Sequence, residues 1–282
     1  MTALRVRPIR IRQRGTAAVP HVILFIACFL AVAPFVWSFF GSFKPFKELI
    51  SSKDILPHVW TTAHYDEIIN RAHFLDAFKN SVVVSTLMTA ACLFTSSTLG
   101  YIFAKYRFRG KNLLFGLMVS TLFVPFVVLL VPLYITMGKL GLINNIGGVI
   151  ILGLWTSLGI FMMRQFMSSI PDELIDAARI DGASEWRVFL RVVLPLATAP
   201  LAALGILVFL GSWDNFLWPS VILTSPENQT LPLLLSGLKN LYWSRYDLWS
   251  AGSMLTVIPV MIVYLFASKY FIRGVAMTGL KG

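Results

Sequence analysis

The sequence of 282 residues is 57% hydrophobic and only 13% charged, whereas an ordinary soluble domain carries about 25% charged residues. Its net charge of +11 does not indicate a nucleic-acid partner, because the basic residues are scattered over short segments and form no single basic region. The two cysteines are too few for a disulfide framework, and we interpret both as small apolar residues buried inside spans. This composition is typical of a membrane protein.

Six segments without Asp, Glu, Lys or Arg exceed twenty residues: 15–43, 80–104, 112–138, 140–163, 192–213 and 248–268. About twenty apolar residues in a helix cross a hydrocarbon core of about 30 Å. The first segment is too long for the apolar part of a cleaved signal peptide, which has about 7 to 15 residues. We therefore expect an all-α membrane protein in which residues 1–19 form a basic tail and residues 20–282 form a domain of six transmembrane helices.

The distribution of charge predicts the orientation of these spans, because Lys and Arg in short loops are held on the cytoplasmic side. With the N-terminus inside, the predicted inner segments hold 16 of the 24 basic residues and 5 of the 13 acidic ones. The predicted outer segments hold eight of each. The whole positive excess thus lies on one side, and both termini are predicted to be cytoplasmic.

The second span is rich in hydroxyl groups, and small hydroxylated residues in membrane helices favour close helix packing over pore lining. The residues concerned are Ser85, Thr86, Thr89, Thr95, Ser96, Ser97 and Thr98. The outer loop before this span contains His58, His64 and His73. Their spacing suits no compact metal site and no cysteine lies nearby, so we expect no bound metal.

The longest predicted inner connection lies within residues 164–195 and contains the sequence DAARIDGASEWRVFLRVVLP. A helix is predicted to start around Ser169, Pro171 and Asp172, with the hydroxyl as its cap. It is predicted to end at Gly182, because glycine readily takes the positive φ of a helix C-cap. Ser184 can cap a second helix, and Pro195 predicts a break before the fifth span.

The second helix would carry an apolar stripe formed by Trp186, Phe189, Leu190 and Val193. Between the two helices, Ala177, Ala178 and Gly182 would leave a small-residue surface that the backbone of a partner can approach closely. The composition alone is equally compatible with an interfacial linker whose stripe lies on lipid.

The spacing of Asp176-Ala177-Ala178, Gly182, Val192 and Leu194-Pro195 resembles the EAA loop of bacterial binding-protein-dependent ABC importer permeases. The stretches SFKPFKEL, NSVVVS, WDNFLWPSVILT and YFIRGVAMTGLKG are similar to the carbohydrate branch of that family, in particular to the maltose-type second permease. Two positions depart from the pattern, since Asp176 stands where Glu is usual and Val192 where Ile is usual.

The resemblance implies the type I ABC importer permease fold in a bacterial inner membrane, surrounded by lipid. It also implies three kinds of protein partner: a second homologous permease, two ATPase subunits, and an extracytoplasmic solute-binding protein. In this family the EAA loop forms a coupling helix that sits in a groove of the ATPase. The predicted ATPase-coupling residues are therefore Asp176, Ala177, Ala178, Arg179, Gly182, Leu194 and Pro195.

No enzymatic activity is expected of this chain, which contains no GxxxxGK[ST] phosphate loop, no HExxH helix and no nucleophile elbow. By the resemblance, ATP and Mg would be bound by the partner ATPase. No cofactor is expected in the chain itself.

Two outer segments are candidates for contact with substrate or with the binding protein. Asp214 and Asn215 lie beside Trp213 and Trp218, which we interpret as part of an interfacial aromatic belt. For Tyr242, Trp243 and Tyr246, stacking on a sugar is one interpretation. We favour contact with the binding protein, because the resemblance implies it for the corresponding loop of the maltose-type system. The tail 278–282 resembles a family ending that reaches toward the ATPases, although a frayed terminus fits equally well.

The expected function is uptake of a sugar or oligosaccharide, with glycerol phosphate, a phosphodiester or another polyol as the alternative cargo. An ion-coupled secondary transporter would require charged groups within the membrane, and all six predicted spans lack them. A membrane-embedded enzyme would require a cluster of catalytic side chains at one depth, which the sequence does not contain.

Overall fold

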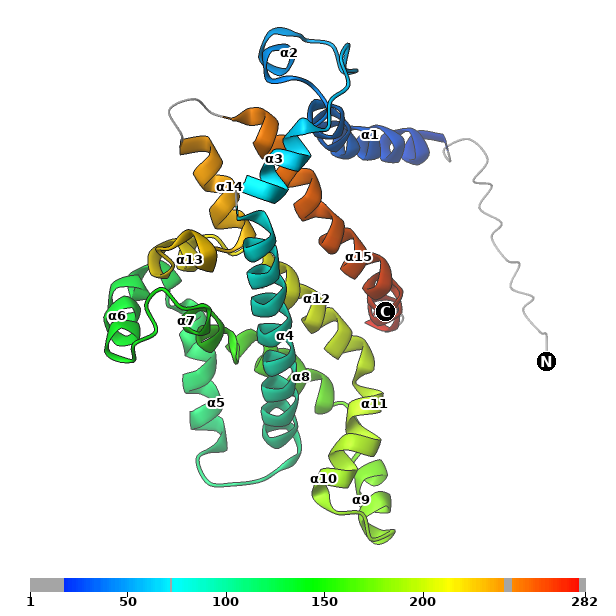
Figure 1. The fold of residues 1–282 in the computed structure, drawn as a ribbon. Coiled ribbons are helices and arrows are strands. Elements are labelled where there is room, and N and C mark those ends of the chain that lie inside the picture. Colours follow the sequence, from blue (N-terminus) through cyan, green and yellow to red (C-terminus); the bar gives the residue numbers. More distant parts are fainter. Residues whose placement is uncertain (1–17, 72, 241–244, 279–282) are drawn as a thin grey trace, which may run out of the picture.

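The computed structural model describes residues 18–71, 73–240 and 245–278, and every regular element in these ranges is helical (Figure 1). The first half of the chain contains α1 (Ala18–Gly41), α2 (Phe46–Ser51), α3 (Ala63–Arg71), α4 (Phe74–Lys105), α5 (Lys111–Ser120), η1 (Thr121–Phe123), α6 (Phe126–Lys139), α7 (Ile146–Ile150) and η2 (Ile151–Gly153). The second half contains α8 (Ser157–Met167), α9 (Asp172–Ile180), α10 (Glu185–Val188), the π-helical turn η3 (Phe189–Val193), α11 (Leu194–Leu196), α12 (Thr198–Trp213), α13 (Leu217–Ile222), η4 (Pro226–Asn228), α14 (Leu231–Asn240) and α15 (Tyr246–Thr278).

Five helical segments in the described chain are long and apolar enough to cross a membrane, and one bent pair of helices provides a sixth span if it is counted as one. The five are Pro20–Gly41, Phe74–Lys105, Ile146–Met167, Thr198–Ile222 and Tyr246–Phe266. They agree with the predicted spans, except that the span predicted over 192–213 begins at Thr198 and continues to Ile222. The expectation of an all-α membrane protein is confirmed.

The third predicted span is not one straight helix. Its two halves, Lys111–Phe123 and Phe126–Lys139, are bent by 103° at the break between them. Val124 has an extended backbone with ψ 115°, which a residue before proline favours because the proline ring crowds the α conformation. Pro132 lies inside α6 without ending it, so proline content alone would not have predicted where the span breaks.

The core is organised around α4, which packs along α8 and α12 (Figure 1). Small residues allow this approach: a Cβ added to Gly159 would lie 2.4 Å from Ser96 Oγ, and one added to Gly100 would lie 2.5 Å from Met163 Cβ. Ser85, Ser96 and Ser97 are buried. For these three serines, the prediction of helix packing is confirmed.

The start of the fifth span is irregular around Pro195. The preceding turn, η3, is π-helical, and Leu194 N–H donates to Phe189 O. Proline has no N–H for the carbonyl four residues earlier, and its ring crowds that carbonyl, so the local hydrogen bonds shift to a wider turn. The break predicted at Pro195 is therefore a distorted helix that ends at Leu196, and α12 begins at Thr198.

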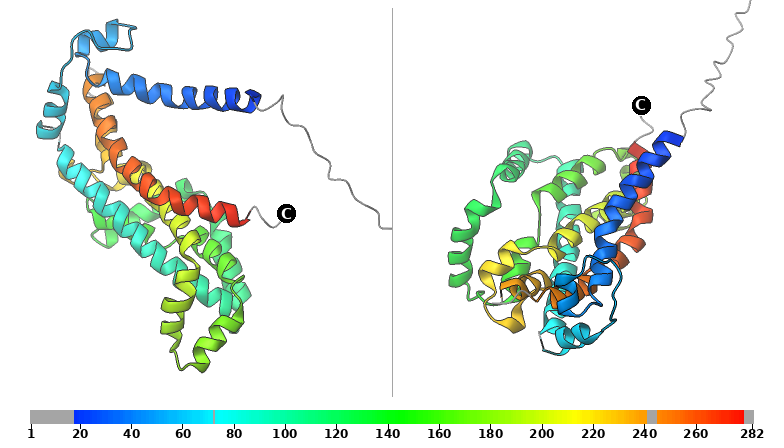
Figure 2. Two further views of the ribbon diagram at one scale, coloured as in Figure 1. Left: turned by 90° about the vertical axis from the view of Figure 1, so that its right-hand side faces the viewer. Right: turned by 90° about the horizontal axis from the view of Figure 1, so that it is seen from above.

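Helix α1 projects from the rest of the chain and meets it mainly near α15 (Figure 2). No residue in its most apolar window is buried within the chain, and Cys28 is exposed. The expectation that both cysteines are buried is thus wrong for Cys28 and correct for Cys92. Most apolar side chains of α1 and α6 face outward, whereas Leu130, Leu133 and Met137 of α6 pack in the core. The outward faces are available to lipid or to another apolar surface.

The interpretation of Trp213 and Trp218 as part of an interfacial aromatic belt is wrong. Each is only 1% exposed. Trp213 stacks on Phe209 at 5.8 Å between ring centroids, and Trp218 Nε1 donates to Gly148 O at 3.0 Å. The short helix α13 folds back against α6 and α7, and this packing buries the indole of Trp218.

The loops separate into two groups at opposite ends of α4 (Figure 1). The hairpin 106–110 and the pair α9–α10 lie at one end, whereas α2, α3 and α14 lie at the other. This grouping matches the predicted division into inner and outer loops. The orientation of the termini relative to the membrane stays a prediction, and residues 279–282 of the tail lie outside the described residues.

Candidate functional site

The segment from Arg164 to Pro195, called the coupling loop below, forms a helical hairpin. Its first helix, α9, begins directly after Pro171. The sequence predicted that the Ser169 hydroxyl caps α9. In the structure it does not, because this hydroxyl donates backward to Phe166 O at 2.7 Å. Pro171 occupies the N-cap position and has no side-chain acceptor for the first N–H groups of the helix, so α9 starts without a side-chain cap.

Helix α9 ends at Ile180, and Gly182 takes the left-handed position after it, as predicted. Gly182 has φ +81°, its N–H donates to Arg179 O, and Ala183 N–H donates to Ala178 O, both at 3.0 Å. These two bonds form a Schellman motif, in which a left-handed residue satisfies the last carbonyls of a helix. The motif turns the chain sharply into α10.

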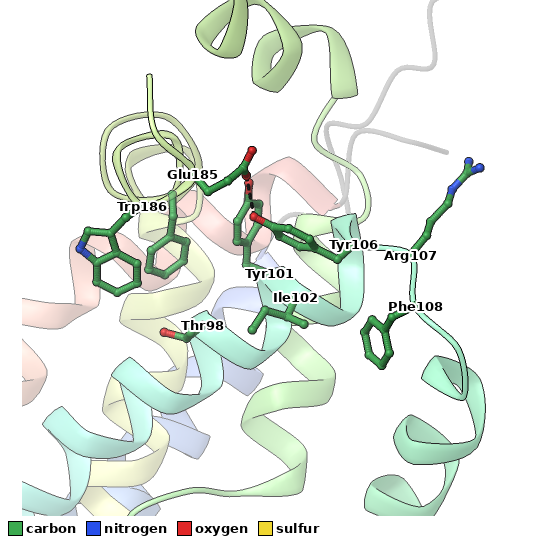
Figure 3. Close-up of a pocket in the computed structure, with 9 residues that line it drawn as sticks. Thr98, Tyr101, Ile102, Tyr106, Arg107, Phe108, Glu185 and Trp186 are labelled. Carbon is green, nitrogen blue, oxygen red and sulfur yellow. Dashed lines mark hydrogen bonds between the residues drawn. The ribbon is translucent and has the colours of Figure 1, made fainter. Parts of the chain in front are cut away.

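Four polar residues, called the clasp below, tie the two helices of the coupling loop to the end of α4. Arg179 Nε and Nη2 donate to the two carboxylate oxygens of Glu185 at 2.8 and 3.1 Å, and Arg179 Nη1 donates to Asp176 Oδ1 at 3.0 Å. The Tyr106 hydroxyl donates to Glu185 Oε2 at 2.5 Å (Figure 3). A bidentate arginine pair of this kind fixes orientation as well as distance.

A second attachment lies beside the clasp. Lys105, the last residue of α4, donates through Nζ to Ile170 O and to Asp172 Oδ1, the latter at 2.6 Å. The lysine side chain is nearly buried, whereas Asp172 is exposed. Both ends of α9 are thus held, directly or through Glu185, by the end of one membrane helix.

The carboxylates at this end have lowered pKa values because basic groups donate to their charged forms. Arg179, and then Tyr106, lower the pKa of Glu185, and Lys105 lowers the pKa of Asp172. A lowered folded-state pKa stabilises the fold at pH values above the unfolded pKa of about 4.3, and this contribution is lost as the pH falls through the folded value. The attachment should therefore be intact throughout the neutral range.

Replacing Glu185 by glutamine should loosen the coupling loop at pH 7. The loss of a charged partner for Arg179 is worth about 1 kcal/mol or less at this exposed position, so amide exchange over residues 172–188 should accelerate by up to about fivefold. Hydrogen-exchange mass spectrometry would measure this. Glu173→Gln, which removes an exposed carboxylate from α9 of the same loop, should leave exchange unchanged. Equal exchange in both variants would show that the clasp does not order the loop.

The coupling loop presents an exposed surface, called the tip below, formed by Ala177, Ile180, Asp181 and Gly182. Ile180 is 86% exposed, and nothing lies within 4 Å of a Cβ added to Gly182. A single exposed apolar residue is common on protein surfaces, so Ile180 indicates docking only because it stands beside the predicted coupling residues Ala177 and Gly182. The sequence analysis did not identify Ile180, because residues distant in the chain decide whether an isoleucine at a helix end is covered.

The other predicted coupling residues lie around this tip. The Asp176 side chain is 62% exposed while it accepts a hydrogen bond from Arg179. Ala178 is half-buried and packs against the core cluster that contains Ile175 and Phe189. Leu194 is half-buried and Pro195 exposed at the base of the loop, so these two shape the attachment and are not part of the tip.

A cavity of about 380 Å³ separates α10 from the end of α4 and the following hairpin (Figure 3). Its walls include Tyr101, Ile102, Phe108, Trp186 and Phe189. Phe189 stacks on Tyr101 at 5.3 Å, and Phe189 and Val193 of the predicted apolar stripe are buried, whereas Trp186 and Leu190 are exposed. Packing inside the chain therefore accounts for half of the stripe.

The outer candidates are less closely grouped. Tyr246 is exposed at the start of α15, and Asp214 is exposed at the end of α12 beside the half-buried Asn215. Tyr242 and Trp243 lie outside the described residues. The arrangement of the described candidates by itself defines no binding site.

An ionic cluster at the end of the fold opposite the coupling loop was not predicted. Arg245 donates to both carboxylate oxygens of Glu67 at 3.0 and 2.9 Å and to Asp247 Oδ2 at 2.9 Å. His64 Nδ1 lies 3.1 Å from the same oxygen of Asp247. The cluster joins α3 to the start of α15, and its partners are too far apart in sequence for spacing to reveal. Among the described residues, no group of three or more His, Cys, Asp or Glu side chains could hold a metal ion.

Comparison with known proteins gives consistent matches. A family model described as "Binding-protein-dependent transport system inner membrane component" matches residues 96–276. The arabinooligosaccharides transport system permease protein AraQ of Halalkalibacterium halodurans is 39% identical over 262 residues, which cover 92% of this chain and 94% of that protein. The lactose transport system permease protein LacG of Rhizobium radiobacter is 31% identical, with coverage of 94% and 96%.

Among solved structures, a chain of a bacterial ABC transporter involved in the import of the acidic polysaccharide alginate has the same fold. Its TM-score is 0.81 at 24% identity, with coverage of 94% of this chain and 100% of that chain. At this level of identity the likeness concerns the fold.

Proposed function

Since this chain belongs to the family of binding-protein-dependent transport system inner membrane components, we propose that it is one of two permease subunits of an ATP-driven importer for a sugar or oligosaccharide. The relatives that cover nearly its whole length are named for transport of arabinooligosaccharides and lactose, which supports a carbohydrate over glycerol phosphate or another polyol. The family is one of membrane components without an ATPase, so ATP and Mg are bound by separate subunits.

The coupling loop docks, in this proposal, on one of two ATPase subunits through its tip. The observation that carries this assignment is the exposed Ile180 beside Ala177 and Gly182. Asp176 and Arg179 form its polar edge, and Arg179 is already held by Glu185. Position 176 holds Asp where the family usually has Glu. Its carboxylate accepts a hydrogen bond from Arg179 of the same chain.

The clasp supplies the mechanical link. When the ATPases close on ATP, a displaced tip moves α9, and the bonds from Tyr106 and Lys105 carry that displacement to the end of α4. Because α4 packs along α8 and α12, the core moves largely as a rigid body, which is how an interface movement becomes a two-state change. The outward apolar faces of α1 and α6 suit the second permease and lipid.

The solute-binding protein meets the outer end, where Tyr246 is exposed and where Asp214 and Asn215 lie. The ionic cluster of Arg245, Glu67 and Asp247 keeps the start of α15 in place for this contact. Both termini are cytoplasmic in this arrangement, and residues 1–19 are a basic inner tail.

Reconstitution tests the proposal. Liposomes containing this chain, its second permease and the ATPase should hydrolyse ATP faster when sugar-loaded binding protein is added outside. Ile180→Asp should reduce ATPase co-purification at least about tenfold, because a charge replaces a central apolar contact. Leu174→Asp, a similar change on the same helix but away from the tip, should reduce it less. Normal co-purification of the ATPase with Ile180→Asp would contradict the assignment of the tip as the docking surface. If no sugar-loaded binding protein stimulated ATP hydrolysis, the importer assignment would be wrong.

A further inference from the structure

Two membrane spans are interrupted at the same place in the fold. The third is broken between η1 and α6, and the fourth has no regular helix from Leu154 to Thr156, between η2 and α8. The two breaks are joined by a hydrogen bond of 2.7 Å between Thr121 Oγ1 and Ser157 Oγ. Thr95 Oγ1 of α4 donates to Leu154 O at 2.8 Å.

Interrupted spans are informative because lipid cannot hydrogen-bond a freed backbone group. Non-helical backbone at membrane depth occurs where it is buried in protein or lines a water-filled cavity. In transporters, discontinuous helices of this kind commonly form the substrate site near the bilayer midplane. Both breaks here lie in the middle of spans, away from the coupling loop and from the outer loops.

A cavity of about 330 Å³ lies between these breaks, which is within the range of small-molecule sites, about 300–1,000 Å³. Its walls combine apolar side chains with three hydroxyl groups and one indole. The residues that give it this character are Thr121, Leu122, Phe126, Trp155, Thr156 and Ser157.

Trp155 is the most distinctive of these residues. Its side chain is 49% exposed although it lies in the middle of a predicted span. Within the described residues, neither its indole N–H nor the Thr156 hydroxyl has a hydrogen-bond partner. Indole N–H groups removed from water normally find an acceptor, so a ligand with many hydroxyl groups would satisfy both donors while stacking on the ring.

The cavity contains no charged side chain. An anionic cargo such as a phosphate ester would enter it uncompensated, and an unpaired charge in the membrane interior is strongly unfavourable. A neutral polyhydroxylated ring presents an apolar face to the indole and hydroxyl groups to Thr121 and Thr156. The chemistry of the lining thus selects an uncharged sugar.

We propose that the cavity between the broken third and fourth spans is a carbohydrate contact site of this subunit, with Trp155 as its stacking platform. The inference rests on the proposed importer function and specifies where cargo touches this chain. It gives the subunit a direct part in sugar passage in addition to its contact with the ATPase.

The test uses the complete importer in liposomes with the ATPase inside and sugar-loaded binding protein outside. Trp155→Ala should lower sugar uptake by about tenfold, since it removes an aromatic contact, and Trp155→Phe should keep at least about half of the uptake. Phe123→Ala is the control, because Phe123 is 84% exposed at the same break but does not line the cavity. It should transport normally.

Stimulated ATP hydrolysis separates the two levels of inference. In Trp155→Ala the binding protein should still accelerate ATP hydrolysis, because docking at both ends is unchanged, while sugar delivered per ATP falls. Wild-type uptake in Trp155→Ala would overturn the carbohydrate site. So would a loss of uptake in Phe123→Ala and Trp155→Phe as large as the loss in Trp155→Ala. Failure of the wild-type complex to respond to any sugar-loaded binding protein would instead overturn the importer function.

Discussion

Replacing Gly182 by tryptophan should reduce co-purification of the ATPase subunit by at least about tenfold, because an indole would protrude from the tip, the proposed docking surface. Space within the chain is not the limit, since a Cβ at this position meets no atom within 4 Å. The backbone contributes as well: φ +81° is left-handed, which costs an L-residue about 1–2 kcal/mol. Asparagine tolerates this conformation better, so Gly182→Asn should retain more of the complex than Gly182→Trp.

Gly141 provides the matched control for this experiment. It has φ +69° and also meets no atom within 4 Å of an added Cβ, but it lies in the turn between α6 and α7, away from the coupling loop. Gly141→Trp therefore imposes a similar backbone strain without obstructing the tip. Quantitative affinity purification of the tagged permease would compare the variants. If both tryptophan variants lose the ATPase equally, backbone strain and not docking explains the loss.

Gly100→Ala should destabilise the permease by about 2–3 kcal/mol, as overpacking a tight core typically does. The added methyl would lie 2.5 Å from Met163 Cβ and 3.0 Å from Arg164 N. Real Cβ atoms do not approach this closely, and the obstacle includes the α8 backbone, which cannot turn aside as a flexible side chain can. The helices α4 and α8 must separate, and the burial of Ser96 and Ser97 between them is lost.

Gly116→Ala is the corresponding control, because nothing lies within 4 Å of a Cβ at that position of α5. Alanine favours a helix over glycine by up to about 1 kcal/mol, so this variant should be as stable as the original or slightly more so. The two variants would be heated in detergent, and the fraction of protein that stays monodisperse at each temperature would be measured. A Gly100→Ala protein that melts together with Gly116→Ala would show that the α4–α8 contact adjusts at little cost.

Much of the membrane architecture could be predicted from the sequence. The apolar runs located the spans, because transfer from water to hydrocarbon depends on the local composition of about twenty residues. The end of α9 just before Gly182 was also predictable, since a positive φ is a local preference of glycine. The break in the third span was not, because Pro125 interrupts a helix whereas Pro132 lies inside one.

The functional surfaces show where prediction from sequence stopped. The EAA-like spacing named Leu194 and Pro195 among the predicted coupling residues, and in the structure both lie at the base of the coupling loop, apart from the tip. It also passed over Ile180 and Glu185. Glu185 meets Tyr106 across 79 positions of sequence, and no local pattern specifies a partner so distant. The aromatic belt expected at Trp213 and Trp218 was wrong for the same reason, since helix packing covers both rings.

The sequence by itself determined the number of apolar spans, the placement of the loops between them and the helix end in the coupling loop, because hydrophobicity and backbone preference act over short stretches. The tertiary structure alone decided which side chains remain exposed, and it brought the break near Thr121 to the break near Ser157. It also attached the coupling loop to α4 through Tyr106 and Lys105. These features depend on contacts between distant segments, which form only when the helices pack together.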